Sequence, residues 1–241
     1  MNNLHRIQPP VLPVEKVVIP EVLSFRLNNE VPVYLIEAGT EEIMRLEFTF
    51  RAGQVNEHWP MLASTTNMML SEGSQNYSSE ELNRLVDYYG AFLSSSTEKD
   101  QAGIVVFFLN KHIEKVLELC REILFRPVFP EPELNSLMKK RLRWYLVARE
   151  KVNNLAIDQF FESVFGKHHP YGHKVLEQDF DRMNPTLLKD FHSKYYTPDN
   201  MAVIISGKIH QKTNELLDHY FGDITTKKTD PEDKKLSLIH I

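Results

Sequence analysis

The fold of this chain is decided by one stretch, residues 62–74, with the sequence Leu-Ala-Ser-Thr-Thr-Asn-Met-Met-Leu-Ser-Glu-Gly-Ser. Apolar side chains recur at the spacing of one helical face: Met61, Leu62, Met68 and Met69. The pattern predicts a helix that ends at Gly73. Because the methionines follow the same spacing as the leucines, core packing is favoured over a soft-metal site or a promiscuous binding surface.

Short extended runs precede this helix. Residues 22–27 and 31–37 lie on either side of Asn28-Asn29, a pattern that predicts a β-hairpin. Residues 44–51 alternate apolar and polar side chains, which is typical of a strand with one buried face. The three strands together begin an antiparallel sheet.

A second helix and two further strands follow. A serine, Ser78 or Ser79, stands as a cap three residues before a glutamate, so we expect a helix from there to Gly90. Residues 91–96 form a candidate strand, and residues 103–109 are an almost unbroken apolar run of strand length. Such a run is expected for a strand covered on both faces.

The rest of the chain is mainly helical. Helical patterns, interrupted by an apolar strand at 201–206, cover residues 113–124, 132–149, 155–165, 185–195 and 211–221. This order of elements predicts an α+β fold, a mainly antiparallel sheet covered on one face by helices. We expect one domain at residues 21–224, a proline-rich leader at 1–20, and a linker or truncated tail at 225–241. Residues 236–241 are apolar again without any cap, which indicates a truncated product.

Composition excludes several classes of function. The net charge of -5 and the lack of a basic block argue against a nucleic-acid partner. No segment reaches the roughly 20 apolar residues of a membrane span, and the N-terminus lacks the apolar core of a signal peptide. We therefore expect a soluble, cytoplasmic protein. The single cysteine, Cys120, lies on the apolar face of a predicted helix, and we expect a buried core thiol.

Residues 62–74 resemble the signature helix of the insulinase/pitrilysin family of zinc peptidases, which includes mitochondrial processing peptidase. In that family the helix reads Leu-Ala-His-x-x-Glu-His-Met-Leu-x-x-Gly-Thr. Further stretches resemble the family in the same order: Arg51-Ala52-Gly53, Gly90-Ala91-Phe92-Leu93 with Thr97, His169-Pro170-Tyr171-Gly172, and residues 191–207. The resemblance covers about residues 22–223 and implies a metallohydrolase-like domain, one half of a clamshell.

The residues that carry the family's chemistry are missing. Two histidines four residues apart bind zinc in the family, and the glutamate between them holds the attacking water. Those positions here are Ser64, Met68 and Asn67. The third ligand position, on a later helix, falls at about Trp144, and a further family asparagine corresponds to Ser94. The resemblance therefore implies no catalytic residue, no metal ligand and no zinc cofactor.

One other cluster is a metal candidate. His168, His169 and His173 lie close together in sequence, but no nearby carboxylate run completes a ligand set. The family has a His-Pro-Tyr-Gly stretch here, so a structural loop is the favoured interpretation.

Three functions fit these observations. The first is a non-catalytic partner subunit of a metal-bearing homologous peptidase, which holds an extended peptide on an edge strand that includes Ser94, Ser95 and Ser96. The second is a structural scaffold, as in the related core subunits of the respiratory cytochrome complex. The third, disfavoured by the missing ligands, is an active zinc metalloendopeptidase with a rearranged site.

Overall fold

The computed structural model describes residues 20–225. The expected leader and tail, including residues 236–241, lie outside this range except for Pro20 and Thr225. The strands are β1 (Leu23–Arg26), β2 (Pro32–Glu37), β3 (Ile43–Phe50), β4 (Phe92–Thr97), β5 (Ala102–Leu109) and β6 (Met201–Gly207). The α-helices are α1 (Leu62–Met69), α2 (Ser79–Tyr88), α3 (Ile113–Phe125), α4 (Glu131–Ala148), α5 (Val152–Phe165), α6 (Glu177–Phe180), α7 (Pro185–Tyr195) and α8 (Thr213–Phe221).

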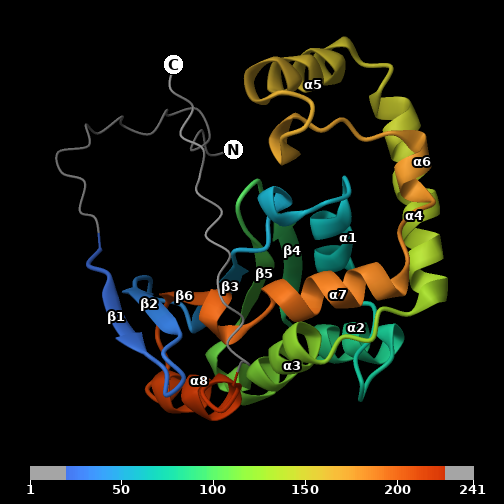
Figure 1. Cartoon of the computed structure of the whole chain (residues 1–241). Coiled ribbons are helices and arrows are strands. Elements are labelled where there is room, and N and C mark those ends of the chain that lie inside the picture. Colours follow the sequence, from blue (N-terminus) through green and yellow to red (C-terminus); the bar gives the residue numbers. More distant parts are fainter. Residues whose placement is uncertain (1–19, 226–241) are drawn as a thin grey trace, which may run out of the picture.

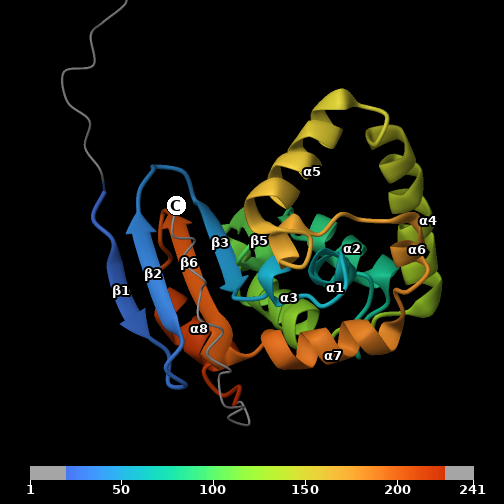
Figure 2. The same cartoon turned by 45° about the horizontal axis from the view of Figure 1, so that its top comes forward.

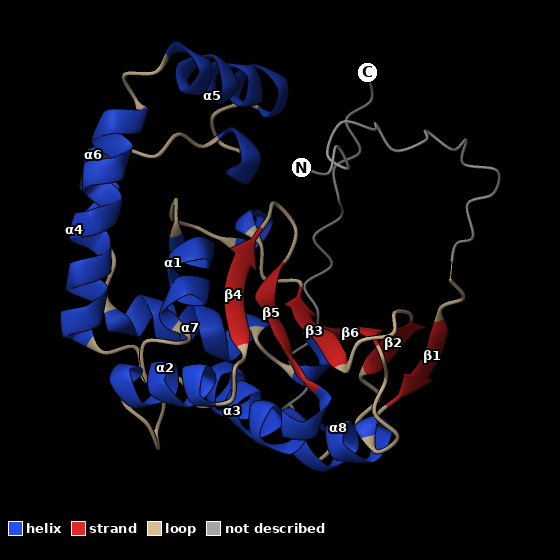
Figure 3. Ribbon diagram, turned by 180° about the vertical axis from the view of Figure 1, so that it is seen from behind, coloured by secondary structure: helices blue, strands red, loops and turns tan. Residues whose placement is uncertain are grey.

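The strands form one sheet in the order β1-β2-β6-β3-β5-β4 (Figure 3). All neighbours are antiparallel except β2 and β6, which are parallel. The predicted hairpin, the strand at 201–206 and the α+β class are therefore confirmed. β6 lies between β2 and β3, so the last strand within residues 20–225 completes the middle of the sheet.

Helices cover one face of the sheet (Figure 2). In β3, Met44, Leu46, Phe48 and Phe50 point into the core and are at most 1% exposed, whereas their neighbours are partly exposed. Phe48 packs on Phe221 of α8, with ring centroids 4.7 Å apart. The strict alternation follows from the two-residue period of a strand with one buried face.

The expectation that β5 is covered on both faces is wrong. Phe107 and Leu109 on its outer face are each 39% exposed, because the helices lie on the opposite side. Phe107 packs beside Phe92 of β4, and the guanidinium of Arg45 lies over its ring at 5.9 Å. On this outer face, neighbouring side chains of the sheet cover part of Phe107, and none of the helices α1–α8 does so.

The start of α2 confirms the predicted capping box and places the cap at Ser78. The Ser78 hydroxyl accepts a hydrogen bond from the Glu81 backbone at 3.3 Å, and the Glu81 carboxylate accepts one from the Ser78 backbone at 2.9 Å. Both bonds satisfy N–H groups that a helix end leaves open. The helix ends at Tyr88, two residues before Gly90.

Two buried-residue predictions have mixed outcomes. Cys120 is 1% exposed, and burial raises the pKa of its thiol to about 12, so it is an inert core group as expected. Met61 and Met69 pack in the core as predicted, but Met68 is 43% exposed. Helical spacing predicts all three methionines on one apolar face, whereas Met68 lies outside that face in the structure.

Helices α4 and α5 form an arm that rises away from the sheet (Figure 1). No residue of α5 is buried, although its sequence is apolar. The arm is tied back to the body through the turn at Pro170–Gly172, where the Tyr171 hydroxyl hydrogen-bonds to Asp100 and Gln54 donates to the Pro170 carbonyl at 3.0 Å. No helix within residues 20–225 is long and apolar enough to span a membrane.

Candidate functional site

The candidate site is built around α1, which lies between α4 and the edge strand β4 (Figures 1 and 3). Ser64 and Asn67, one helical turn apart, occupy the first ligand position and the general-base position of the family motif. Met68 occupies the second ligand position. The three side chains have different surroundings. Each is unable to bind zinc or to act as the general base for a different reason.

Asn67 is a buried structural group with 1% exposure. Its amide nitrogen donates to the carbonyls of Ser96 and Gly103 at 2.6 and 3.0 Å, and lies 3.1 Å from the Thr97 hydroxyl. Its amide oxygen accepts from the hydroxyl of Tyr196 at 3.0 Å. All hydrogen-bonding groups of the amide are used, so Asn67 joins α1 to β4, β5 and the end of α7.

Tyr196 was not singled out from the sequence. It follows α7 within the stretch 191–207 that resembles the family, and this was the only available signal. Its side chain is 3% exposed and stacks on His192 with centroids 5.1 Å apart. Burial raises its pKa above the ordinary value, so the hydroxyl remains a donor to Asn67.

Arg141 of α4 reaches the first ligand position. Its guanidinium donates to the Thr65 hydroxyl at 2.6 Å and to the Ser64 hydroxyl at 2.9 Å. The Ser64 hydroxyl in turn donates to the Met61 carbonyl at 3.1 Å. A positive charge therefore lies beside α1, where the resemblance places a metal ion.

The position on α4 that the resemblance aligns with the family's third ligand is exposed. Trp144 at that position is 71% exposed, and the side chain of α4 that hydrogen-bonds to α1 is Arg141, nearly one turn earlier on the helix. The sequence shows that no carboxylate lies between Glu133 and Glu150. It does not show which side of α4 faces α1. That orientation is set by tertiary packing.

Glu57 holds the start of α1. Its carboxylate is 7% exposed and accepts a hydrogen bond from the Ala63 backbone at 3.0 Å. Burial raises the pKa of Glu57 to about 7, and the hydrogen bonds and the charge of Arg141 oppose that shift. Because its pKa is near neutrality, Glu57 compensates the charge of Arg141 only in part at pH 7.

These residues do not fit a zinc ion. Zinc prefers imidazole, thiolate or carboxylate ligands, whereas α1 offers an engaged hydroxyl, an engaged amide and an exposed thioether. The neighbouring guanidinium repels a cation as well. Across the described part of the chain, no three His, Cys, Asp or Glu side chains form a group that could hold a metal ion.

The histidines at 168, 169 and 173 lie in a packed turn. The Nδ1 atom of His169 accepts from the Tyr171 backbone at 3.1 Å, and its ring stacks on Phe165 with centroids 5.3 Å apart. Lys99 lies over the Phe161 ring at 3.5 Å beside them. These contacts hold the end of α5 against the β4–β5 turn, as the structural-loop interpretation expects.

β4 is an edge strand, as the sequence predicted. The Glu98 backbone donates to the Gln101 carbonyl at 2.7 Å across the β4–β5 turn. Since hydrogen-bonded pairs alternate along an antiparallel ladder, Ser96 and Ser94 pair their backbones with Gly103 and Val105. Of the three predicted serines, only Ser95 directs its backbone groups toward the free edge.

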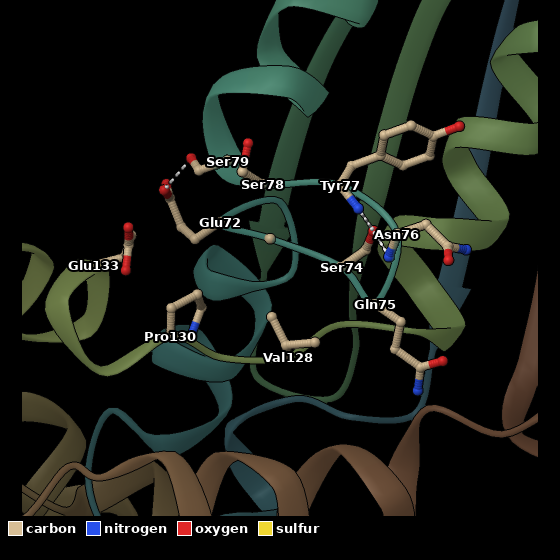
Figure 4. A pocket seen from close by; sticks show the side chains of 11 residues that line it. Glu72, Ser74, Gln75, Asn76, Tyr77, Ser78, Ser79, Val128, Pro130 and Glu133 are labelled. Atoms are coloured by element: carbon tan, nitrogen blue, oxygen red, sulfur yellow. Dashed lines mark hydrogen bonds between the residues drawn. The ribbon is translucent and has the colours of Figure 1, made fainter.

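A separate pocket of 290 Å³ lies between the loop after α1 and the start of α4 (Figure 4). The Glu72 carboxylate accepts from the Ser79 hydroxyl at 2.8 Å, and the Ser74 hydroxyl accepts from the Tyr77 backbone at 3.1 Å. Its lining residues include no histidine, lysine or cysteine. These two hydrogen bonds engage part of the polar lining, whereas Oε2 of Glu133 is buried without a hydrogen-bond partner.

Comparison with known families agrees with this geometry. The model described as Insulinase (Peptidase family M16) matches residues 33–178, and the model described as Peptidase M16 inactive domain matches residues 182–241. Because the first match covers more than half of the chain, the protein belongs to the insulinase family, peptidase family M16.

Curated relatives include both proteases and subunits of complexes. Mitochondrial-processing peptidase subunit alpha-1 of Dictyostelium discoideum is 31% identical over 71% of this chain and 27% of its own length. Zinc protease PqqE of Helicobacter pylori is 23% identical over 86% of this chain and 48% of its own length. Cytochrome b-c1 complex subunit 2 of Schizosaccharomyces pombe is 28% identical over 59% of this chain and 33% of its own length. The chain spans about a quarter to a half of these relatives.

Solved structures share the fold. A peptidase M16 inactive domain from Pseudomonas fluorescens superposes with a TM-score of 0.77 at 22% identity, over 83% of this chain and 50% of that chain. A protease from Helicobacter pylori has a TM-score of 0.75 at 21% identity, over 88% of this chain and 53% of that chain. At these identities the likeness concerns the fold alone.

Proposed function

We propose that this protein is a non-catalytic subunit that pairs with a metal-bearing homologous peptidase and helps to hold an extended peptide. The observation that carries the proposal is the state of α1. Asn67 takes the general-base position and is fully hydrogen-bonded inside the protein, and Arg141 approaches the first ligand position. A neutral amide cannot accept a proton from water, so this helix serves structure in place of hydrolysis.

The proposal includes the absence of bound zinc and of peptidase activity in the lone chain. Metal analysis of the purified protein after incubation with zinc tests this part. We expect substoichiometric zinc and no chelator-sensitive cleavage of a casein substrate. One tightly bound zinc per chain together with such cleavage would establish the rearranged-site alternative instead.

The arm supports a protein partner. Val152, Phe160 and Val164 lie on one side of α5, at successive spacings of eight and four residues, and are 79%, 60% and 44% exposed. Contiguous exposed apolar surface of this kind marks a contact with another protein. Relatives named as subunits of a processing peptidase and of a cytochrome complex support the same conclusion.

The free edge of β4 supports peptide binding. An extended peptide adds to an exposed sheet edge through backbone hydrogen bonds, which require no metal. The backbone groups of Ser95 are directed to that edge, beside α1. We infer a site for an unfolded protein segment or a peptide along this strand.

The deciding experiment mixes the purified chain with a homologous subunit from the same source that carries an intact His-x-x-Glu-His motif. We expect a stable complex by size-exclusion chromatography with light scattering, and faster peptide cleavage by the complex than by the homologue alone. Absence of a complex would contradict the proposal. The cytoplasmic location stays a prediction.

A structural scaffold is the second candidate, favoured by the similarity to cytochrome b-c1 complex subunits. The same mixing experiment separates the two functions. A scaffold forms a complex but leaves the rate of peptide cleavage unchanged, whereas a peptide-holding subunit raises it.

A further inference from the structure

Arg141 has a charge that its surroundings do not neutralise. Two of the five N–H groups of its guanidinium donate to Ser64 and Thr65. Within residues 20–225, no carboxylate lies within ion-pair distance of it, and Glu57 acts only from farther away with a pKa of about 7. A partly buried cation of this kind favours an additional acceptor.

The residues around the guanidinium of Arg141 indicate which kind of ligand could supply the additional acceptor. Ser64, which binds Arg141, and Asn67, which binds the carbonyl of Ser96 in β4, are one turn apart on the same face of α1. One helical turn rises about 5 Å, so Ser64, the partner of Arg141, is about one turn from the residue that binds the end of the edge strand. A chain added to β4 would run past this part of α1, where Met68 is 43% exposed.

We propose that Arg141 is a peptide-binding residue: its free N–H groups donate to an oxygen of a peptide held along β4, either a main-chain carbonyl or the C-terminal carboxylate. The inference rests on the proposed peptide-holding function and adds the residue and the chemical group that it binds. Arginine suits this role because its planar fork donates two parallel hydrogen bonds. The bond is noncovalent and leads to no cleavage.

The test uses fluorescence anisotropy of the full chain with a panel of fluorescein-labelled extended peptides, each made with a free C-terminal carboxylate and as an amide. We compare Arg141→Met and Arg141→Lys with the wild type. Arg143→Met is the matched control, because Arg143 is an exposed arginine on the same helix. Loss of a charge-assisted hydrogen bond weakens binding by roughly tenfold to a hundredfold.

The expected result is weaker peptide binding by Arg141→Met, partial recovery by Arg141→Lys, and wild-type affinity for Arg143→Met. If the C-terminal carboxylate is the acceptor, amidation of the peptide weakens its binding to the wild type but not to Arg141→Met. If a main-chain carbonyl is the acceptor, Arg141→Met lowers the affinity for the carboxylate and amide forms of the peptide by the same factor. Wild-type affinity in Arg141→Met would overturn the inference and leave the peptide-holding function intact. Failure of the wild type to bind any peptide would remove both.

A second measurement follows binding in the wild-type chain and uses a variant only to assign one signal. In the wild-type chain, the NMR signal of the Arg141 side-chain N–H is assigned by comparison with Arg141→Lys and followed during titration with the tightest peptide. A shift that saturates with the anisotropy curve supports the inference. An unchanged signal at saturation contradicts it.

Discussion

Helices α1 and α5 distribute their side chains in opposite ways. α1 is short and buries polar groups, and those of Asn67 find partners inside the chain. α5 is longer and apolar, yet none of its residues is buried. The chain therefore accounts for the buried polar residue of its signature helix by itself, whereas apolar side chains of α5 such as Val152 and Phe160 are exposed within residues 20–225.

Replacing an asparagine by leucine should change the free energy of unfolding far more on α1 than on α5, and this is the largest difference that we expect. Asn67→Leu removes the amide that joins α1 to β4, β5 and Tyr196, and leaves the Tyr196 hydroxyl buried without its acceptor. We expect a loss of about 3 kcal/mol in the free energy of unfolding, measured by urea denaturation. Asn153→Leu, at an exposed position of α5, should change it by less than about 0.5 kcal/mol. Equal effects would remove the contrast between the helices.

A zinc site should be recoverable only if the charge beside α1 is reversed. Ser64→His with Met68→His supplies two imidazoles on one helical face, but Arg141 repels the ion. Adding Arg141→Glu supplies a third ligand, and we expect zinc to bind roughly a hundredfold more tightly than to the double variant. Competition with a zinc-sensitive dye measures the affinity.

The control is Trp144→Glu in the same double variant, because Trp144 points to solvent. We expect little gain from this change. If Trp144→Glu gives the tighter site, α4 faces α1 with a different rotation from the one described.

Glu57 makes the stability of the α1 region depend on pH. Its pKa rises from the ordinary 4.5 to about 7 on folding, so the folded protein binds more protons than the unfolded chain between these values. The free energy of unfolding should therefore fall as the pH rises from about 4.5 to 7 and level off above that range. Glu57→Gln keeps an acceptor for the Ala63 backbone and should reduce this fall by about 3 kcal/mol in urea titrations at several pH values. If Glu57→Gln shows the same decrease in the free energy of unfolding with pH as the wild type, a group other than Glu57 binds the proton on folding.

The smallest effect on stability, and the largest on association, is expected on α5. Phe160→Glu with Val164→Glu replaces exposed side chains and should change the free energy of unfolding by less than about 0.5 kcal/mol. The same variant should lose the complex with the metal-bearing homologue in light scattering, because charges replace the apolar contact. Asn153→Glu adds a charge to the same helix and should retain the complex. A complex that survives the double change lies on another surface.

Local patterns predicted most of the elements. The strand alternation and the capping box at Ser78 depend on short stretches of sequence, and the structure confirms them. The edge position of residues 91–96 is an expectation from the family resemblance alone, and β4 lies at that edge. Family resemblance located α1 as the centre of the site. These features need no knowledge of which element packs on which.

The errors concern contacts between distant elements. The exposure of Met68 and the open face of β5 depend on how helices pack against the sheet. The hydrogen bond of Arg141 to α1, which no sequence pattern predicted, depends on the same packing. Apolar runs and helical periods do not contain that information, because they are the same for a covered and an uncovered face. The tyrosine that completes the Asn67 hydrogen bonds lies far along the chain for the same reason.

The place of β6 between β2 and β3 bears on how the chain acquires its structure. Until Met201–Gly207 has been synthesised, the hairpin β1–β2 and the strands β3–β5–β4 have no strand to connect them. Loop closure over most of the domain must precede the last pairing, which slows folding and exposes two unsatisfied strand edges during translation. A nascent chain halted before this strand should therefore bind chaperones through its open strand edges, whereas a chain extended past β6 can join the two parts of the sheet in one step.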